Sequence, residues 1–269
     1  MIENINQRIK TLPPLPKSFH DINAVCMDEN GTVNQLAKVI ETDPMLVANL
    51  LKVANSPLYS FRREIKSVLQ AISLFGMSTT RALTTDISIK KLLNVDIEPY
   101  GIIPEDFVQI SGLQSTLMRE WYDKVDRKKA DTLFLAALLQ ETGKILIADE
   151  VVKNDEAVQF KSEIETTANI AQVEQSFVGT TTAKITAKIF EHWGFDETMV
   201  EAIFYADSVG EAPEHIREYS LALKIVKTAV PMNAPLSERS VTIALSLVRS
   251  EGYKESIFAD AIEKIIENF

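Results

Sequence analysis

Apolar residues recur along this chain with the three- and four-residue spacing of amphipathic helices, and no stretch of five or more residues alternates as a strand does. Two helix starts carry clear capping signals. Thr32 and Gln35 have the spacing of a capping box, in which each side chain satisfies a backbone amide at the helix start. Asp43 is a good N-cap, and Pro44 is a good first helical residue. The pattern therefore predicts an all-α protein.

Further helices are expected between the turn signals. Ser67 with Gln70 opens a helix that Gly76 fits as a stop, and Ser78 opens another that runs to about Leu93. The remaining expected helices lie at about 105–123, 129–141, 144–152, 156–167, 170–177, 181–193, 196–207, 213–228, 236–249 and 253–267. They differ in length and in caps, which argues against a repeat protein.

The stretch 94–104 holds two prolines and Gly101, and it is the best candidate for a boundary within the chain. We therefore expect a smaller N-terminal helical subdomain, residues 1–95. A larger C-terminal helical subdomain, residues 96–269, would follow it. No helix carries the sustained heptads of a coiled coil, so the pattern sets no oligomeric state.

Composition narrows the classes of function. The chain is 46% hydrophobic and 25% charged, as ordinary globular proteins are. Its net charge of -10 repels phosphate backbones at long range, so nucleic acid is not an expected partner. The opening MIENINQRIK lacks the apolar core of a signal peptide, and no apolar run reaches the roughly 18 residues that suggest a membrane span. A cytoplasmic location without a membrane partner is expected.

Side chains that ligate transition metals are scarce. The three histidines, His20, His192 and His215, form no pair at metal-binding spacing. The single Cys26 excludes an internal disulfide and a cysteine-based zinc site. A site built mainly on imidazole is therefore not expected. We interpret His192, at the end of an expected helix, as a cap that complements the helix dipole.

The most informative polar pair lies in the run LLQETGK, residues 138–144. An apolar helix delivers Gln140 and Glu141 to a buried helix end, after which Gly143 is expected to break the helix and Lys144 to begin the next apolar run. Burying Glu141 without a cation would raise its pKa or cost stability. A nearby Lys or Arg is therefore expected, and Lys144 is the candidate.

Several stretches together resemble the HDOD domain, a bacterial signalling-output module related to HD-type metal-dependent phosphohydrolases. They are LPPLP at 12–16, the Asp43-Pro44 turn, Asn55-Ser56, and IKSVLQAISLFG at 65–76. The resemblance extends through residues 138–144 and covers roughly residues 10–230. It implies one HDOD module folded as a multi-helix, HD-like bundle.

HD phosphohydrolases hold one or two metals with a His, an adjacent His-Asp pair, and later His and Asp residues, and the metal ionises the attacking water. By resemblance, the His-Asp pair falls on Gln140-Glu141. The positions that correspond approximately to the other metal ligands are Ile110, Thr182, Ala206-Asp207 and Val230. No imidazole stands at a matched position, so the resemblance implies a protein without catalytic residues, bound metal or cofactor. The vestigial pocket would contain Gln140, Glu141, Lys144, Thr182 and Asp207.

The resemblance implies a non-enzymatic regulatory role in a bacterial cytoplasm, exerted on an unidentified signalling protein or through a small ligand. Two alternatives stay open. The first is a residual phosphodiesterase or phosphatase, in which Glu141 and Asp207 hold Mg²⁺ or Mn²⁺. The second is a cyclic-dinucleotide or nucleic-acid binder that contacts anions through one of two basic clusters. These clusters are Arg62-Arg63 and Arg127-Lys128-Lys129.

Overall fold

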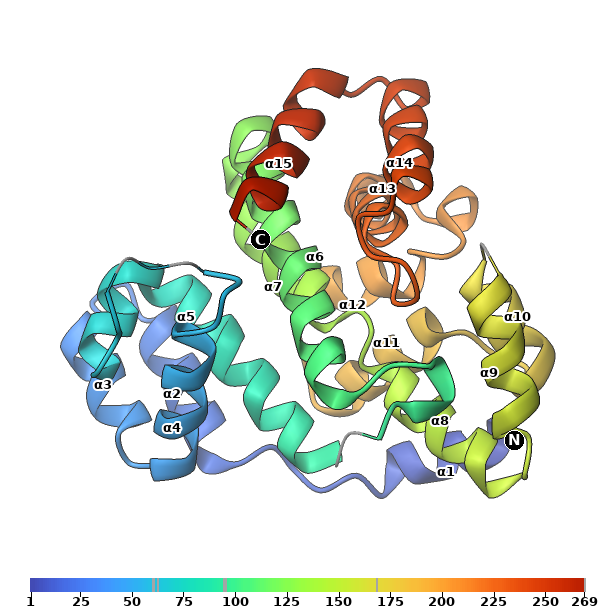
Figure 1. The fold of residues 1–269 in the computed structure, drawn as a ribbon. Helices are drawn as coiled ribbons and strands as arrows, with labels where there is room; N and C mark the ends of the chain where they lie inside the picture. The colour runs from blue at the N-terminus through green and yellow to red at the C-terminus, as the bar shows by residue number, and fades with distance from the viewer. Residues whose placement is uncertain (60, 62, 94–95, 168, 269) are drawn as a thin grey trace. The chain divides into compact units, whose positions relative to one another are not determined.

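The computed structural model describes residues 1–59, 61, 63–93, 96–167 and 169–268, and every regular element in these ranges is a helix (Figure 1). The expected all-α fold is thereby confirmed. None of the helices in these ranges combines the length and the apolar character needed to cross a bilayer.

The chain divides into two compact units. The smaller unit comprises residues 13–94 and 266–269, and the larger unit comprises residues 1–12 and 95–265. The division expected from the sequence falls beside residues 94–95, which lie outside the described residues. The first twelve residues depart from that expectation, because they belong to the larger unit.

The smaller unit contains α2 (Lys17–Met27), α3 (Val33–Ile40), α4 (Pro44–Ala54) and α5 (Val68–Leu93). Both expected caps are present: Thr32 and Gln35 form a complete capping box, and the Asp43 carboxylate accepts hydrogen bonds from the first turn of α4. Gly76, with φ 78° and ψ 167°, makes a kink within α5. The sequence predicts that one helix ends at Gly76 and that another begins after it. The structure has a kink there instead, with a backbone conformation that glycine adopts most easily.

The larger unit contains the remaining helices. In chain order they are α1 (Ile2–Lys10), η1 (Glu98–Tyr100), α6 (Pro104–Val125), α7 (Arg127–Leu139), α8 (Gly143–Lys153), α9 (Ala157–Thr166), α10 (Ile170–Val178), α11 (Thr182–His192), α12 (Glu197–Phe204), η2 (Val209–Glu211), α13 (Glu214–Ala229), α14 (Glu238–Ser250) and α15 (Glu255–Asn268), the last being counted here to residue 265. Each helix expected from residue 105 onward is found, with ends that agree within three residues.

Helices α1 and α2 were not anticipated from the sequence. Each buries only two side chains along its own length, which are Ile5 and Ile9 in α1 and Phe19 and Ile22 in α2. Two buried positions give too short a repeat for a helical period to stand out. Tertiary contacts hold α1 in place, because it packs against α8 and α11.

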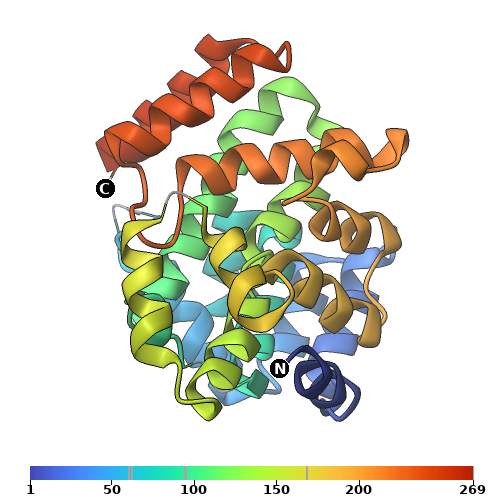
Figure 2. The same ribbon diagram turned by 90° about the vertical axis from the view of Figure 1, so that its right-hand side faces the viewer.

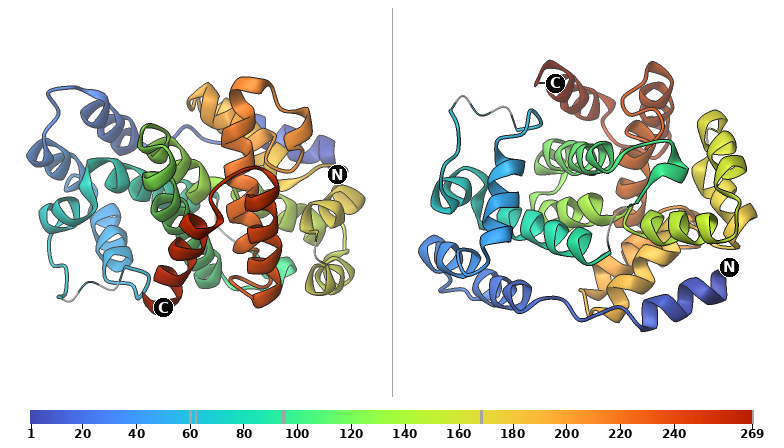
Figure 3. Two further views of the ribbon diagram at one scale, coloured as in Figure 1. Left: turned by 90° about the horizontal axis from the view of Figure 1, so that it is seen from above. Right: turned by 60° about the horizontal axis from the view of Figure 1, so that its bottom comes forward.

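Helices α6 and α7 pair along their length, and α13 packs against both. Helix α15 lies beside α6 (Figures 1 and 2), where the ring of Phe258 stands 4.8 Å from that of Trp121. Helices α9 and α10 pack beside α8 (Figure 3). This arrangement surrounds the turn between α7 and α8 with helices that are distant in sequence, so the polar residues of the turn lie in the interior.

Candidate functional site

The turn that carries Gln140 and Glu141 connects α7 to α8 and is clamped against α11. Helix α7 ends at Leu139, and Gly143 is the first residue of α8, so Gly143 is not the residue that breaks the helix. Its amide donates a hydrogen bond to Thr186 Oγ1 at 2.8 Å. A Cβ at this position would lie 2.6 Å from the Thr182 carbonyl oxygen. Glycine is therefore required here by the close approach of α11.

Glu141 is buried and paired with the cation that the sequence predicts. Its Oε2 lies 3.1 Å from Lys144 Nζ, and each side chain is only 1% exposed. Burial acts to raise the pKa of Glu141, but the ammonium groups of Lys144 and Lys227 outweigh burial and hold the pKa below its ordinary value. Glu141 is therefore a carboxylate at neutral pH.

Lys144 has a second carboxylate partner, Glu174 of α10, which sequence reasoning missed. The Lys144 Nζ lies 2.8 Å from Glu174 Oε1 and also donates to Thr182 Oγ1 at 3.1 Å. The Thr182 amide donates to Glu174 Oε2 at 2.6 Å, and the Tyr100 hydroxyl donates to Glu174 Oε1 at 2.9 Å. Lys144 Nζ thus has two hydrogen-bond acceptors, and it also lies 3.1 Å from the Glu141 carboxylate and 4.8 Å from the centroid of the Tyr100 ring.

A second ion pair joins Asp207, which follows α12, to Lys227 of α13. Asp207 Oδ1 lies 2.9 Å from Lys227 Nζ, and the two side chains are 17% and 16% exposed. Burial alone would raise the pKa of Asp207 and lower that of Lys227. The attraction between the pair reverses both effects, so Asp207 titrates below and Lys227 above its ordinary range. Lys227 was not identified from the sequence.

Gln114 of α6 connects the two sides of the site and was also missed. Its Nε2 donates to Glu141 Oε1 at 3.1 Å and to the Val230 carbonyl at 2.9 Å, and its Oε1 accepts from Gln140 Nε2 at 2.9 Å. Gln114 lies four residues after Ile110, one helical turn along α6. That spacing is a signal that could have identified it.

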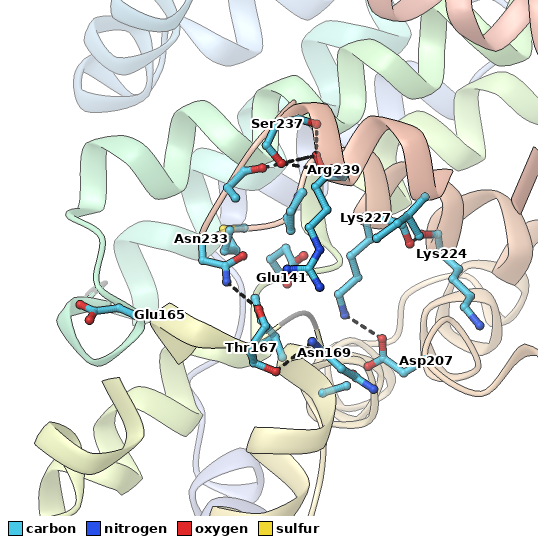
Figure 4. A pocket seen from close by; sticks show the side chains of 18 of the residues that line it. Glu141, Glu165, Thr167, Asn169, Asp207, Lys224, Lys227, Asn233, Ser237 and Arg239 are labelled. Carbon is cyan, nitrogen blue, oxygen red and sulfur yellow. Dashed lines mark hydrogen bonds and ion pairs between the residues drawn. The ribbon is translucent and has the colours of Figure 1, made fainter. Parts of the chain in front are cut away.

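The expected site residues fall into two groups. Gln140, Lys144 and Thr182 are buried and do not line the pocket, whereas Glu141 and Asp207 line a pocket of about 450 Å³ (Figure 4). The pocket lies between the N-terminal ends of α10 and α14, the end of α12, and α13. Among the other positions matched by resemblance, Ile110, Ala206 and Val230 are buried.

These residues do not fit a divalent metal. Among the residues that the structure describes, no three His, Cys, Asp or Glu side chains gather closely enough to hold one. Glu141 and Asp207 lie 3.1 and 2.9 Å from the side-chain nitrogens of Lys144 and Lys227, respectively. A lysine ammonium donates hydrogen bonds and has no lone pair for a metal. The positive charge that a metal would bring is here supplied by Lys144 and Lys227.

The basic cluster Arg127-Lys128-Lys129 stands apart from this pocket, because none of the three residues lines it. Lys129 is paired with Glu218 at 2.6 Å and with Asp126 at 3.3 Å. Arg127 and Lys128 are exposed at the start of α7. Of the other cluster, Arg62 lies outside the described residues.

His192 ends α11, as the capping interpretation expects. Its Nε2 lies 3.4 Å from the Leu12 carbonyl oxygen. The ring therefore connects the end of α11 to the segment after α1, and His192 is not among the residues that line the pocket.

Comparison with solved structures shows proteins that share this fold. A protein from Campylobacter jejuni subsp. jejuni described as a virulence factor has a TM-score of 0.60 and 24% sequence identity, over 100% of this chain and 98% of that one. An HDOD domain protein from Geobacter sulfurreducens has a TM-score of 0.71 and 17% identity, over 99% and 95% of the two chains. At these identities the likeness concerns the fold.

No curated protein matches the chain. The sequence model of the HDOD domain matches residues 12–209, which is most of the chain and includes the α7–α8 turn with its buried polar pair. The protein therefore belongs to the HDOD domain family.

Proposed function

We propose that this HDOD protein is a non-catalytic regulatory module of bacterial signal transduction that acts by binding a partner protein. The observation that carries the proposal is the pairing of Glu141 with Lys144 and of Asp207 with Lys227. In a phosphohydrolase of related fold, a metal at this place would ionise a water molecule. Here the carboxylates pair with lysines instead of a metal ion. A lysine ammonium group is not a Lewis acid, so it does not ionise a bound water molecule as a metal ion does.

The rival function is residual phosphodiester or phosphomonoester hydrolysis with Mg²⁺ or Mn²⁺ on Glu141 and Asp207. For that chemistry a metal would have to displace the ammonium of Lys227 from Asp207 and compete with that of Lys144 for Glu141. Lys227 would then lose its paired carboxylate and Lys144 would keep only Glu174, both in a largely buried place, which is unfavourable. The arrangement therefore supports the regulatory role over hydrolysis.

A metal and turnover assay tests the absence of catalysis. The intact chain is purified without chelators, its metal content is measured by mass spectrometry, and bis(p-nitrophenyl) phosphate and p-nitrophenyl phosphate are offered with Mg²⁺ or Mn²⁺. We expect no stoichiometric metal and no hydrolysis above that of buffer with metal. Stoichiometric metal together with turnover that Glu141→Gln abolishes would establish the rival function.

Affinity capture tests the partner-binding part of the proposal. The tagged intact chain is used as bait in cytoplasm from the source bacterium, and bound proteins are compared with those on an unrelated tagged α-helical protein. We expect a specific signalling protein that binds the purified chain again when both are mixed. Identical sets of proteins on the two baits would contradict an adaptor role.

A nucleic-acid or cyclic-dinucleotide site on Arg127-Lys128-Lys129 has weaker support. Lys129 already neutralises Glu218 and Asp126, which leaves two exposed cations on a chain of net charge -10. A triple replacement of the cluster by Gln is expected to leave any binding of cyclic di-GMP unchanged. Salt-dependent binding that this replacement removes would favour the nucleotide-binding alternative.

A further inference from the structure

The pocket beside Glu141 has the size of a small-molecule site. Its volume of about 450 Å³ lies in the range of ligand pockets. Apolar side chains such as Ile170, Met232 and Ile243 line it together with charged and amide groups. Polar and charged residues outnumber the apolar ones in this lining, so polar groups would orient a ligand while the apolar side chains add contact area.

Two cations that line this pocket, Arg239 and Lys224, have no ion pair or side-chain hydrogen bond with the described residues. Lys227 is paired with Asp207. Figure 4 shows the Arg239 guanidinium directed toward the middle of the pocket, whereas Lys224 and Glu165 are directed outward. A guanidinium presents its donors as a planar fork that matches an oxyanion. Arg239 is therefore placed to receive one.

Two helix N-termini reinforce the preference for an oxyanion. Asn169 and Ser237, which cap α10 and α14, both line the pocket, as do residues of the first turn of each helix. The amides at a helix start lack partners within the helix, and the helix dipole places partial positive charge there. Negative charge bound between these ends is stabilised in the same way as a phosphate at a helix N-terminus.

A buried acceptor stands opposite these donors. Asp207 Oδ1 accepts from Lys227. The Thr181 hydroxyl also acts to lower the pKa of this carboxyl, but Asp207 Oδ2 is buried and no donor among the described residues reaches it within hydrogen-bond distance and angle. A buried carboxylate oxygen without a donor is costly. Since Asp207 lines the pocket, a hydroxyl group on a bound molecule would satisfy this oxygen.

We propose that the pocket binds a small hydroxylated organic oxyanion, either a phosphate ester or a carboxylate. Arg239 and the starts of α10 and α14 receive the anionic group, and Asp207 Oδ2 accepts a hydrogen bond from a ligand hydroxyl. The inference rests on the proposed non-catalytic role and deepens it, because it gives the regulatory module a ligand class. The ligand is held without being hydrolysed.

Binding is tested by calorimetry and thermal unfolding of the intact chain at low ionic strength. The probes are ribose 5-phosphate, gluconate and inorganic phosphate. We expect one hydroxylated probe to bind and to raise the Tm, and comparison of the first two identifies the anionic group. Arg239→Gln is expected to weaken that binding by about tenfold or more, since a hydrogen bond to a charged group contributes roughly 1.5–3 kcal/mol.

Arg127→Gln serves as the matched control, because Arg127 is also exposed at a helix start but lies outside the pocket. This variant is expected to bind as the unchanged chain does. The inference is overturned if none of the probes binds, or if Arg239→Gln and Arg127→Gln bind equally well. Both positions are exposed, so folding is expected to survive each change, and circular dichroism verifies it.

The same samples separate this inference from the proposed function. After incubation, phosphorus NMR reports whether ribose 5-phosphate is intact. Binding with an intact probe supports both proposals. Release of inorganic phosphate by the chain would contradict the non-catalytic role, and with it the statement that the ligand is held unhydrolysed. Absence of binding with an intact probe contradicts the ligand site alone.

Discussion

Lys144 Nζ lies 3.1 Å from Glu141 Oε2, and both side chains are 1% exposed. The same ammonium lies 2.8 Å from Glu174 Oε1, so one lysine compensates two buried carboxylates. Such an arrangement is stable only while it is complete, because removal of one partner leaves the others charged in a medium of low dielectric constant. Lys144 is thus the residue on which the polar interior of the larger unit depends most.

Lys144→Met should destabilise the protein by about 3–5 kcal/mol, since it leaves Glu141 and Glu174 buried without their cation. The free energy of unfolding, obtained from urea denaturation, measures the effect. Lys17→Met is the control: the Lys17 side chain is 89% exposed and its pair with Asp21 spans 3.8 Å, so a change within about 1 kcal/mol is expected there. Equal effects of the two replacements would contradict the role of Lys144.

Lys227→Met should increase the affinity of the pocket for Mn²⁺. The change removes the ammonium 2.9 Å from Asp207 and leaves two pocket carboxylates, Asp207 and Glu141, without this competing charge. Oxygen ligands suit hard divalent cations. The measurement is the rise of Tm with added MnCl₂, compared with that of the unchanged chain. If both chains respond alike, Lys227 does not take the place of a metal.

The stability of the protein should fall as the pH falls from neutral into the acid range. The pKa values of Glu141 and Asp207 are lowered in the folded state. Their contribution is therefore complete above the unfolded-state pKa of about 4, and it is lost as pH falls through the folded-state pKa. Glu141→Gln should flatten this dependence when urea unfolding is followed from pH 7 downward. An unchanged slope in the variant would exclude Glu141 as a source of the pH dependence.

Gly143→Ala should destabilise the protein by about 1–3 kcal/mol through overpacking. The new Cβ would lie 2.6 Å from the Thr182 carbonyl oxygen and 2.9 Å from the Thr186 amide nitrogen, both backbone atoms of α11. Gly210→Ala is the matched control, since a Cβ there meets nothing within 4 Å. Thermal unfolding compares the two variants. A Gly143→Ala variant as stable as Gly210→Ala would mean that α11 can move away without cost.

The fold class and most helices were predictable from the sequence because their signals are local. Capping residues such as Thr32 and Asp43 act on the turn that follows them, and a helical period needs only neighbouring residues. The same local reasoning identified Gln140-Glu141 as a buried polar pair and Lys144 as the cation for Glu141. It failed for α1, whose two buried residues are held by contacts with α8 and α11.

The candidate site was only partly predictable, because its missing members are distant in sequence. Glu174 and Lys227 stand on α10 and α13, and Gln114 stands on α6. Periodicity indicates which face of each helix is buried, but it does not indicate which buried faces meet.

By itself, therefore, the sequence determined an all-α HDOD chain without imidazole at the matched metal positions. Only the tertiary structure decided that two lysines neutralise Glu141 and Asp207, and that Arg239 faces the pocket without a partner among the described residues. The physical reason is that charge compensation depends on distance in space, which helix packing sets.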